Sequence, residues 1–316
     1  MHGVIHVGVD LMGADFDPLH LLDSLCAAQF PEEVHLTLLG LPSLFSGKHS
    51  PSPHIAFFPT PQFISQDEAP VAALRKKNNS SIAIGIRLIQ EKKLHAFISA
   101  GNTGALMASA KMQLPMIDPI KRPALLALLP TRQQELAVLD VGANAICTPE
   151  QLLQFALIGT AHQKARGIPL PRAGLLNIGT EAGKGTPLLQ KAHQLLSSIP
   201  QDVMTFVGNV EPRDAFQGNL DLLITDGFTG NVFLKTAEGI ARVILEQISS
   251  HPLHSRLHYA EYPGALLCGI DGLIIKCHGG ALPSNILHSI LRAARLHEHH
   301  FIQQIKELLE KERLMR

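Results

Sequence analysis

The stretch Ser99-Ala100-Gly101-Asn102-Thr103-Gly104-Ala105-Leu106-Met107 marks a change from strand to helix. Residues 96–100 form a short apolar run that is typical of a buried strand, and residues 105–112 are helix formers without a breaker. The two glycines allow a tight turn and close approach to a ligand, and the N–H groups at a helix start favour an anion such as phosphate. An ordinary strand-to-helix turn has the same features, so this stretch alone leaves both interpretations open.

The same pattern recurs along the chain. Further strands are predicted at 3–9, 34–39, 54–58, 136–139, 174–178, 205–207, 222–225 and 273–275, with helical segments among them. The helix after Thr148 is marked by a capping box with Gln151. This alternation predicts an α/β fold with three α/β/α layers and a mainly parallel sheet. In such sheets the loops at the carboxyl ends of the strands bind ligands, and here those loops hold Gly, Asn, Asp, Lys and His.

Composition excludes several classes of protein. The chain has 316 residues, 46% of them hydrophobic and 17% charged, a net charge of +0, no Trp and two Tyr. A nucleic-acid binder would show basic excess and stacking aromatics, so no nucleic-acid partner is expected. No apolar run could span a bilayer, and the N-terminus leads directly into a strand, which predicts a cytoplasmic protein. The four cysteines are scattered, which predicts neither a zinc site nor disulfides.

Two apparent motifs do not hold, and two others are absent. Residues 179–186 resemble a P-loop, but the glycine spacing is too short and Gly185 stands where Ser or Thr should hold magnesium. No dinucleotide-binding fingerprint or serine-nucleophile elbow is present. His297, His299 and His300 are interpreted as a histidine-rich helix surface, because no HExxH motif or carboxylate supports a metal site.

Taken together, the loop sequences resemble the phosphate acyltransferases of phospholipid synthesis (the PlsX family). The resemblance is collinear and runs nearly end to end. It is carried by residues 10–13, 99–107, 122–131, 139–144, 154–156, 176–179, 208–214, 226–236 and 276–278.

This resemblance implies a fold like that of isopropylmalate dehydrogenases and phosphotransacetylases. It implies one phosphate acyltransferase domain over 1–316, either undivided or built as two lobes with a cleft, and a homodimer. The implied reaction joins acyl-[acyl carrier protein] and inorganic phosphate to give acyl phosphate and free carrier protein, without a cofactor or metal. The chain departs from the usual family pattern at Ala14, Asp17, Ile146, Thr180 and Cys277.

The candidate site residues follow from the matching loops and from the chemistry of a doubly charged anion, which calls for ammonium groups and N–H donors. Asn102, Thr103 and Gly104 are expected to cradle phosphate, and Lys184 and Lys276 to supply positive charge. Asn209 and Asn231 are expected to donate to phosphate or to the oxyanion of the tetrahedral intermediate. His278 is expected to protonate the leaving sulfur or to orient phosphate. Asp226 and Asp10 are expected to hold the lysines and loop amides in place. Gly13, Gly101, Asn144 and Lys235 complete the expected binding set.

Two functions from other classes stay open. A decarboxylating dehydrogenase on the same fold would need a carboxylate cluster for metal and a nicotinamide pocket, and the carboxylates here are dispersed. A non-catalytic scaffold would bind carrier protein or membrane. Family members carry an amphipathic segment for membrane contact. The corresponding residues 248–263 contain few large apolar residues and few basic ones. This composition predicts weak, peripheral association with the inner membrane face at neutral pH.

Overall fold

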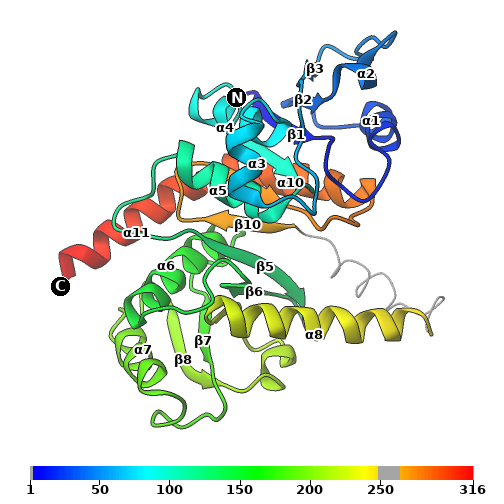
Figure 1. Cartoon of the computed structure of the whole chain (residues 1–316). Coiled ribbons are helices and arrows are strands. Elements are labelled where there is room, and N and C mark those ends of the chain that lie inside the picture. The colour runs from blue at the N-terminus through cyan, green and yellow to red at the C-terminus, as the bar shows by residue number, and fades with distance from the viewer. Residues whose placement is uncertain (1–2, 248–263, 316) are drawn as a thin grey trace. The chain divides into compact units, whose positions relative to one another are not determined.

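The computed structural model describes residues 3–247 and 264–315 (Figure 1). The chain divides into two compact units, unit 1 with Met1–Met116 and Ile270–Glu298, and unit 2 with Ile117–Gly269 and His299–Arg316. The predicted weak membrane association concerned residues 248–263, which lie outside the described residues. Within the described part of the chain, no helix is both long enough and apolar enough to cross a bilayer.

Unit 1 contains parallel strands in the order β3-β2-β1-β4-β11. Their bounds are β1 Ile5–Asp10, β2 Val34–Gly40, β3 Ile55–Pro59, β4 Ala96–Ser99 and β11 Leu273–Lys276. The helices are α1 Pro18–Ala27, α2 Pro42–Phe45, α3 Pro70–Lys76, α4 Ser81–Gln90, α5 Thr103–Gln113 and α10 Pro283–Glu298.

Close packing of α4 on the sheet fixes the centre of unit 1. Gly85 of α4 lies so near β4 that a Cβ atom there would be 2.2 Å from the ring of Phe97. All four residues of β4 are buried, and Phe97 is fully inaccessible. A side chain at position 85 would push the helix away from the sheet, so this glycine permits the short helix-to-strand distance. The packing holds the end of β4, where the Gly-Asn-Thr-Gly turn begins, in a fixed place.

Unit 2 contains strands in the order β10-β5-β6-β9-β7-β8. The pairs β10–β5 and β5–β6 are antiparallel, and the pairs β6–β9, β7–β9 and β7–β8 are parallel. The strands are β5 Ala124–Pro130, β6 Glu135–Leu139, β7 Arg172–Leu176, β8 Thr205–Val210, β9 Leu222–Ile224 and β10 Ala265–Cys268. The helices are α6 Pro149–Ala165, α7 Pro187–Ser197, the 3₁₀ turn η1 Asp214–Gln217, α8 Gly227–Leu245 and α11 Phe301–Met315.

The α/β class and the mainly parallel sheet are confirmed, and the predicted strands all form. The capping box is also confirmed: Thr148 accepts a hydrogen bond from Gln151 N, and the Gln151 side chain accepts one from Thr148 N. Two strands, β5 and β10, were not predicted. Both are almost wholly apolar and buried, and an apolar run of this length can also belong to a buried helix, so it does not identify a strand by itself.

Candidate active site

In unit 1, three functional side chains stand side by side at the carboxyl ends of neighbouring strands. Asp10 ends β1 and is paired in register with Ser99, which ends β4, and Ser99 is paired in turn with Lys276, which ends β11. Parallel strands bring their carboxyl ends to one edge, where the following loops form a binding surface. The structure therefore brings together Asp10 and Lys276, which sequence analysis placed 266 residues apart.

The carboxylate of Asp10 is buried and organises the turn after β4. It accepts hydrogen bonds from Met12 N at 3.0 Å and from Ser99 Oγ at 2.7 Å, and Ser99 Oγ accepts one from Gly101 N at 3.0 Å. Burial raises the pKa of Asp10 from its ordinary 3.8 to about 6, although Ser81, the hydrogen bonds from Ser99 and Met12, and the charge of Lys276 oppose this rise. The chain of bonds ties Gly101 to the end of β1.

Lys276 is half-buried and lies against the same turn. Its Nζ donates to the carbonyl oxygen of Ala100 at 3.2 Å and to that of Cys277. The Ala100 oxygen also accepts a hydrogen bond from Gln66 Nε2 at 2.8 Å, and Gln66 Nε2 donates to Gly13 O at 2.8 Å. Gly13 and Gly101 are packed together, since a Cβ at Gly13 would lie 3.2 Å from the Cα of Gly101. The ammonium group is thus positioned at the start of α5.

Asn102 begins α5, but its side chain is fully used by the protein. Its Oδ1 accepts a hydrogen bond from Ala105 N at 3.0 Å as the helix N-cap, and its Nδ2 donates to the carbonyl oxygens of Ser65, Gln66 and Glu68. The residue is 4% exposed. The expected contribution of Asn102 to phosphate binding is therefore restricted to its backbone, while its amide clamps the loop after residue 64.

Thr103 and Gly104 occupy the first turn of α5, where backbone N–H groups have no partner inside the helix. Thr103 is exposed. The absence of a side chain at Gly104 has a packing reason, because a Cβ there would lie 2.4 Å from Cγ of Pro70. Helix α3, which contains Pro70, would have to move if position 104 carried a side chain. Gly104 therefore admits a neighbouring helix, and its expected contact with phosphate stays a prediction for its backbone N–H.

His278 lies two residues beyond β11 in an exposed loop. Its Nδ1 accepts a hydrogen bond from Gly280 N at 3.2 Å, which leaves Nε2 at the far side of the ring. The loop is attached to the one after β1 through a hydrogen bond of 2.9 Å from Asp15 N to Gly279 O. Unit 1 therefore holds Asp10, Gly13, Gly101 and Lys276 as one cluster, with His278 on an adjoining loop.

In unit 2, the loop after β6 is wrapped around a single carboxylate. Asp140 is 0% exposed, and its Oδ1 accepts hydrogen bonds from the backbone N–H groups of Leu125, Gly142 and Ala143 at 3.0–3.1 Å. Its Oδ2 accepts two more, from N and Nδ2 of Asn144, both at 2.8 Å. Asn144 Nδ2 also donates to Pro123 O. Asp140 and Asn144 thus build the loop, and Asp140 was absent from the predicted site residues.

Helix α8 begins beside this loop. Gly227 N donates to Asn144 O at 2.7 Å, and Asp226 is the N-cap, accepting hydrogen bonds from Thr229 N and Oγ1 at 2.8 and 2.9 Å. Asn231 is exposed on the first turns, and its Oδ1 lies 3.7 Å from the Cβ position of Gly142. Lys235 lies about two turns into the helix and is paired with Glu238 at 2.7 Å. Asn144, Asp226 and Asn231 are therefore neighbours, and Lys235 is directed to Glu238.

The loop after β7 carries Lys184, whose side chain is half-exposed, with Nζ 4.0 Å from Glu181 Oε1. Asn209, at the end of β8, donates from Nδ2 to Glu181 O at 2.7 Å. The Asn209 Oδ1 atom is buried and has no hydrogen-bond partner in the described structure. Asn177 Nδ2 holds the same loop through Lys184 O. Asn209 and Lys184 thus meet at one loop, but the amide of Asn209 is used to fasten it.

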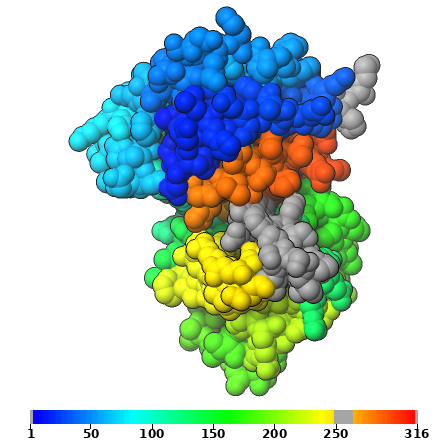
Figure 2. Space-filling view, turned by 90° about the vertical axis from the view of Figure 1, so that its right-hand side faces the viewer, coloured from blue at the N-terminus to red at the C-terminus, as the bar shows by residue number. Residues whose placement is uncertain are grey.

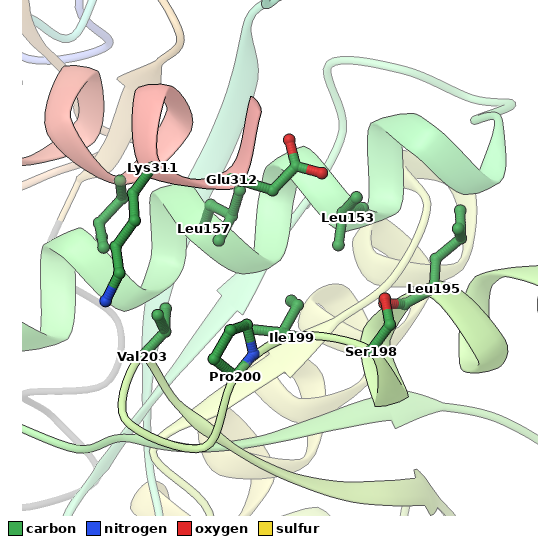
Figure 3. A pocket seen from close by; sticks show the side chains of 10 residues that line it. Leu153, Leu157, Leu195, Ser198, Ile199, Pro200, Val203, Lys311 and Glu312 are labelled. Carbon is green, nitrogen blue, oxygen red and sulfur yellow. The ribbon is translucent and has the colours of Figure 1, made fainter. Parts of the chain in front are cut away.

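A cavity of about 340 Å³ lies in unit 2 away from these loops (Figure 3). It is lined by Leu153 and Leu157 of α6, by Ile199 and Val203 after α7, and by α11, where Lys311 pairs with Asp202 at 2.8 Å. None of its lining residues belongs to a loop at the carboxyl end of a strand. Residues 3–247 and 264–315 contain no group of three or more His, Cys, Asp or Glu side chains arranged to hold a metal ion.

Comparison with known proteins places this arrangement in a family. Residues 5–304 match the family described as fatty acid synthesis protein. The chain is 38% identical to a phosphate acyltransferase of Chlamydia caviae over 90% of this chain and 93% of that protein, and 37% identical to one of Caldanaerobacter subterraneus over 96% and 97%.

Solved structures with the same fold include the EutD phosphotransacetylase of Staphylococcus aureus. It has a TM-score of 0.65 at 15% identity, covering 93% of this chain and 94% of that one. A 4-hydroxythreonine-4-phosphate dehydrogenase of Salmonella typhimurium aligns with a TM-score of 0.57 at 13% identity over 93% and 100%. These two structures show the fold alone, whereas the sequence relatives and the matched family cover almost the whole chain. The chain belongs to the phosphate acyltransferase family.

Proposed function

We propose that this protein transfers a fatty acyl group from the thioester of acyl-[acyl carrier protein] to inorganic phosphate, giving acyl phosphate for phospholipid synthesis. Beyond family membership, one observation carries the proposal. Lys276 and the N-terminus of α5 lie together at the ends of β11 and β4, with the turn between strand and helix held by Asp10 and Ser99. A cation beside a helix N-terminus suits a phosphate dianion.

Phosphate binding is assigned to unit 1. The backbone N–H groups of Thr103 and Gly104 donate to phosphate oxygens, and the Lys276 ammonium balances their charge. The hydrogen bonds from Asn102 to three carbonyl oxygens keep this turn rigid, so little reorganisation accompanies binding. His278 orients the phosphate or protonates the departing sulfur through Nε2, since Nδ1 is occupied by Gly280 N.

The transfer itself needs no covalent enzyme intermediate. A phosphate oxygen attacks the thioester carbonyl carbon, the C–S bond breaks, and the sulfur leaves as a thiolate or takes a proton. A thiol with an ordinary pKa near 8.5 leaves without a strong acid. Within unit 2, Asn231 and Lys184 are assigned as hydrogen-bond donors to the substrates, with Asp226 holding the first turn of α8. Each well-placed donor of this kind contributes about 3 kcal/mol to the transition state.

The proposal extends to partners. Acyl-[acyl carrier protein] is the acyl donor, two copies of the chain form a homodimer, and contact with the inner membrane face is peripheral. Catalysis uses no metal or organic cofactor. Flotation with anionic liposomes at pH 7.5 and 5.5 tests the membrane part, and light scattering on the purified protein tests the dimer.

The decisive experiment incubates the protein with palmitoyl-[acyl carrier protein] and measures free thiol with and without phosphate. We expect thiol release that depends on phosphate. Release at the same rate without phosphate, or none from folded protein, would refute the acyltransferase function. Reduction of NAD in the presence of β-hydroxy acids would instead indicate a dehydrogenase, and we expect none.

Replacement of lysines tests the placement of phosphate. Lys276→Ala should lower kcat/KM about 10²-fold, mainly by raising the KM for phosphate, and Lys184→Ala should lower kcat/KM by a similar factor. Lys111→Ala is the matched control, because Lys111 is exposed at the opposite end of α5. Wild-type kinetics of Lys276→Ala at low phosphate would show that this lysine is structural.

A further inference from the structure

Unit 2 contains a second, larger cavity of about 840 Å³ that runs along α8. One wall is a face of that helix, with Val232 and Phe233 in its second turn, Ala237 in its middle and Ile240 about one turn after Ala237. The opposite walls come from the loop after β7, with Ile178, and from the segment after β8, with Phe216. Helix α8 forms part of the surface of unit 2 (Figure 2).

The lining is apolar although much of it is accessible. Ile178 is 80% exposed, Ile240 57% and Val232 52%, and the rings of Phe216 and Phe233 stack at 5.1 Å. Large apolar side chains left exposed around a concavity mark a binding surface. Of the two charged residues in the lining, Arg213 is paired with Glu211 at 3.0 Å and Asp226 caps α8, so both charges are partnered within the protein.

One end of the cavity coincides with the candidate active site. Asn177, Asp226 and Thr229 belong to its wall, and these residues lie on the loops that carry Lys184 and begin α8. The cavity therefore starts at polar loop groups and continues along an apolar helix face. This polarity matches a molecule with one polar, reactive end and a long apolar tail.

The dimensions match as well. From Asp226 to Ile240 the helix extends about 20 Å at 1.5 Å per residue. A fatty acyl chain of a membrane lipid spans about 15 Å, half of the hydrocarbon thickness of a bilayer. The volume lies within the range of about 300–1,000 Å³ that is usual for ligand pockets.

We propose that this cavity binds the acyl chain of the thioester substrate and sets the preferred chain length, with the carbonyl at the Asp226 end and the methyl end toward Ile240. The proposal rests on the proposed acyl transfer. The cavity shown in Figure 3 is smaller, and no strand-end loop contributes to its lining, so it offers no comparable path from a reactive group.

The test is a chain-length profile of kcat/KM with acyl-[acyl carrier protein] substrates of eight, twelve and sixteen carbons. In the wild type we expect kcat/KM to rise with length by up to about fourfold per added methylene until the cavity is filled. Ala237→Phe places a ring inside the cavity. It should leave the eight-carbon rate within about twofold of wild type and lower the sixteen-carbon rate at least tenfold.

Two variants keep the test independent of misfolding. Ile240→Ser removes apolar surface from an exposed position without adding bulk, and it should weaken only the longer substrates. Val243→Phe is the matched control, since Val243 is 64% exposed on the same helix but is not part of the cavity lining. It should leave the profile unchanged.

The outcomes separate this inference from the proposed function. If activity depends on phosphate but neither Ala237→Phe nor Ile240→Ser changes how kcat/KM varies with chain length, the acyl-binding cavity is refuted and the proposed acyl transfer is not. No activity of the wild type at any chain length would overturn the proposed function itself. An unchanged profile with a changed oligomeric state, measured by light scattering, would show that a second copy of the chain covers the cavity, and this would also overturn the inference.

Discussion

Replacing Asp10 by asparagine should stabilise the protein at neutral pH while impairing its activity. The carboxyl group is 2% exposed, and burial raises its pKa from 3.8 to about 6. At about 1.4 kcal/mol per pKa unit, keeping this group ionised in the folded state at pH 7.5 costs about 3 kcal/mol. Asparagine has the same shape and no charge, so it removes that cost.

The gain is smaller than the full cost because one hydrogen bond must rearrange. Asparagine Oδ1 can still accept from Met12 N, but its Nδ2 cannot accept from Ser99 Oγ, so the Ser99 hydroxyl must turn. A lost or weakened hydrogen bond costs about 1 kcal/mol. We therefore expect Asp10→Asn to be about 1–3 kcal/mol more stable than wild type at pH 7.5.

The pH dependence identifies the cause. The folded state binds the Asp10 proton more tightly than the unfolded state, so wild-type stability falls as pH rises from about 4 to about 6. The advantage of Asp10→Asn should accordingly be small near pH 4.5 and reach its plateau above pH 6. Urea unfolding of both proteins at pH 4.5, 6 and 7.5 measures the difference in their free energies of unfolding. The other titrating groups are the same in both proteins, so their contributions cancel in this difference.

Asp67→Asn is the control, because Asp67 is an exposed carboxylate on the same unit. It should change stability by less than about 0.5 kcal/mol at every pH. A destabilised Asp10→Asn protein at pH 7.5, or an advantage that does not vary with pH, would refute the reasoning. We also expect its kcat/KM to fall at least tenfold, because Asp10 positions Ser99 and the Gly101 turn.

The other predictions concern the glycine turn, the central loop of unit 2 and the amino ends of the strands. Gly101→Val should abolish activity, since even a Cβ there would lie 3.1 Å from Ser99 Oγ, whereas Met107→Leu should be nearly silent; equal thiol-release rates would contradict this. Asp140→Asn should lower the free energy of unfolding in urea by at least about 2 kcal/mol, because an amide cannot accept five N–H bonds. Burial and the neighbouring His297, stacked at 4.4 Å, lower the pKa of His95, so acidification through pH 6.5 should destabilise the fold and His95→Gln should reduce this slope.

The sequence predicted the strands and most helices because strand runs, caps and turns are local signals. The Thr148 capping box and the helix start after Asp226 are formed by residues within four positions of each other. Strand β10 pairs with β5 between residues about 140 apart, Leu126 with Leu266 for example, and no local signal encodes that pairing, whereas β5 also pairs with the neighbouring β6.

The sequence placed the candidate site residues on loops at strand ends, but it did not give what each side chain contacts. Asparagine after a strand suits both a ligand contact and a loop clamp, because its amide can donate and accept at once. Burial decides between the two roles. Asn102, Asn144 and Asn209 are 4–5% exposed and donate to backbone carbonyl oxygens, whereas Asn231 is exposed. A sequence contains no direct measure of burial for a single loop residue.

The two buried carboxylates, Asp10 and Asp140, differ in how many hydrogen-bond donors surround them. Asp140 accepts five hydrogen bonds from N–H groups, so its ionised form is well satisfied and the loop after β6 depends on it. For Asp10 the hydrogen-bond distances show two donors, Met12 N and Ser99 Oγ, and its burial penalises the charge. The same change from aspartate to asparagine should therefore destabilise the protein at position 140 and stabilise it at position 10. The opposite signs expected for the two substitutions would distinguish a carboxylate whose charge the loop after β6 requires from one whose charge the fold does not require.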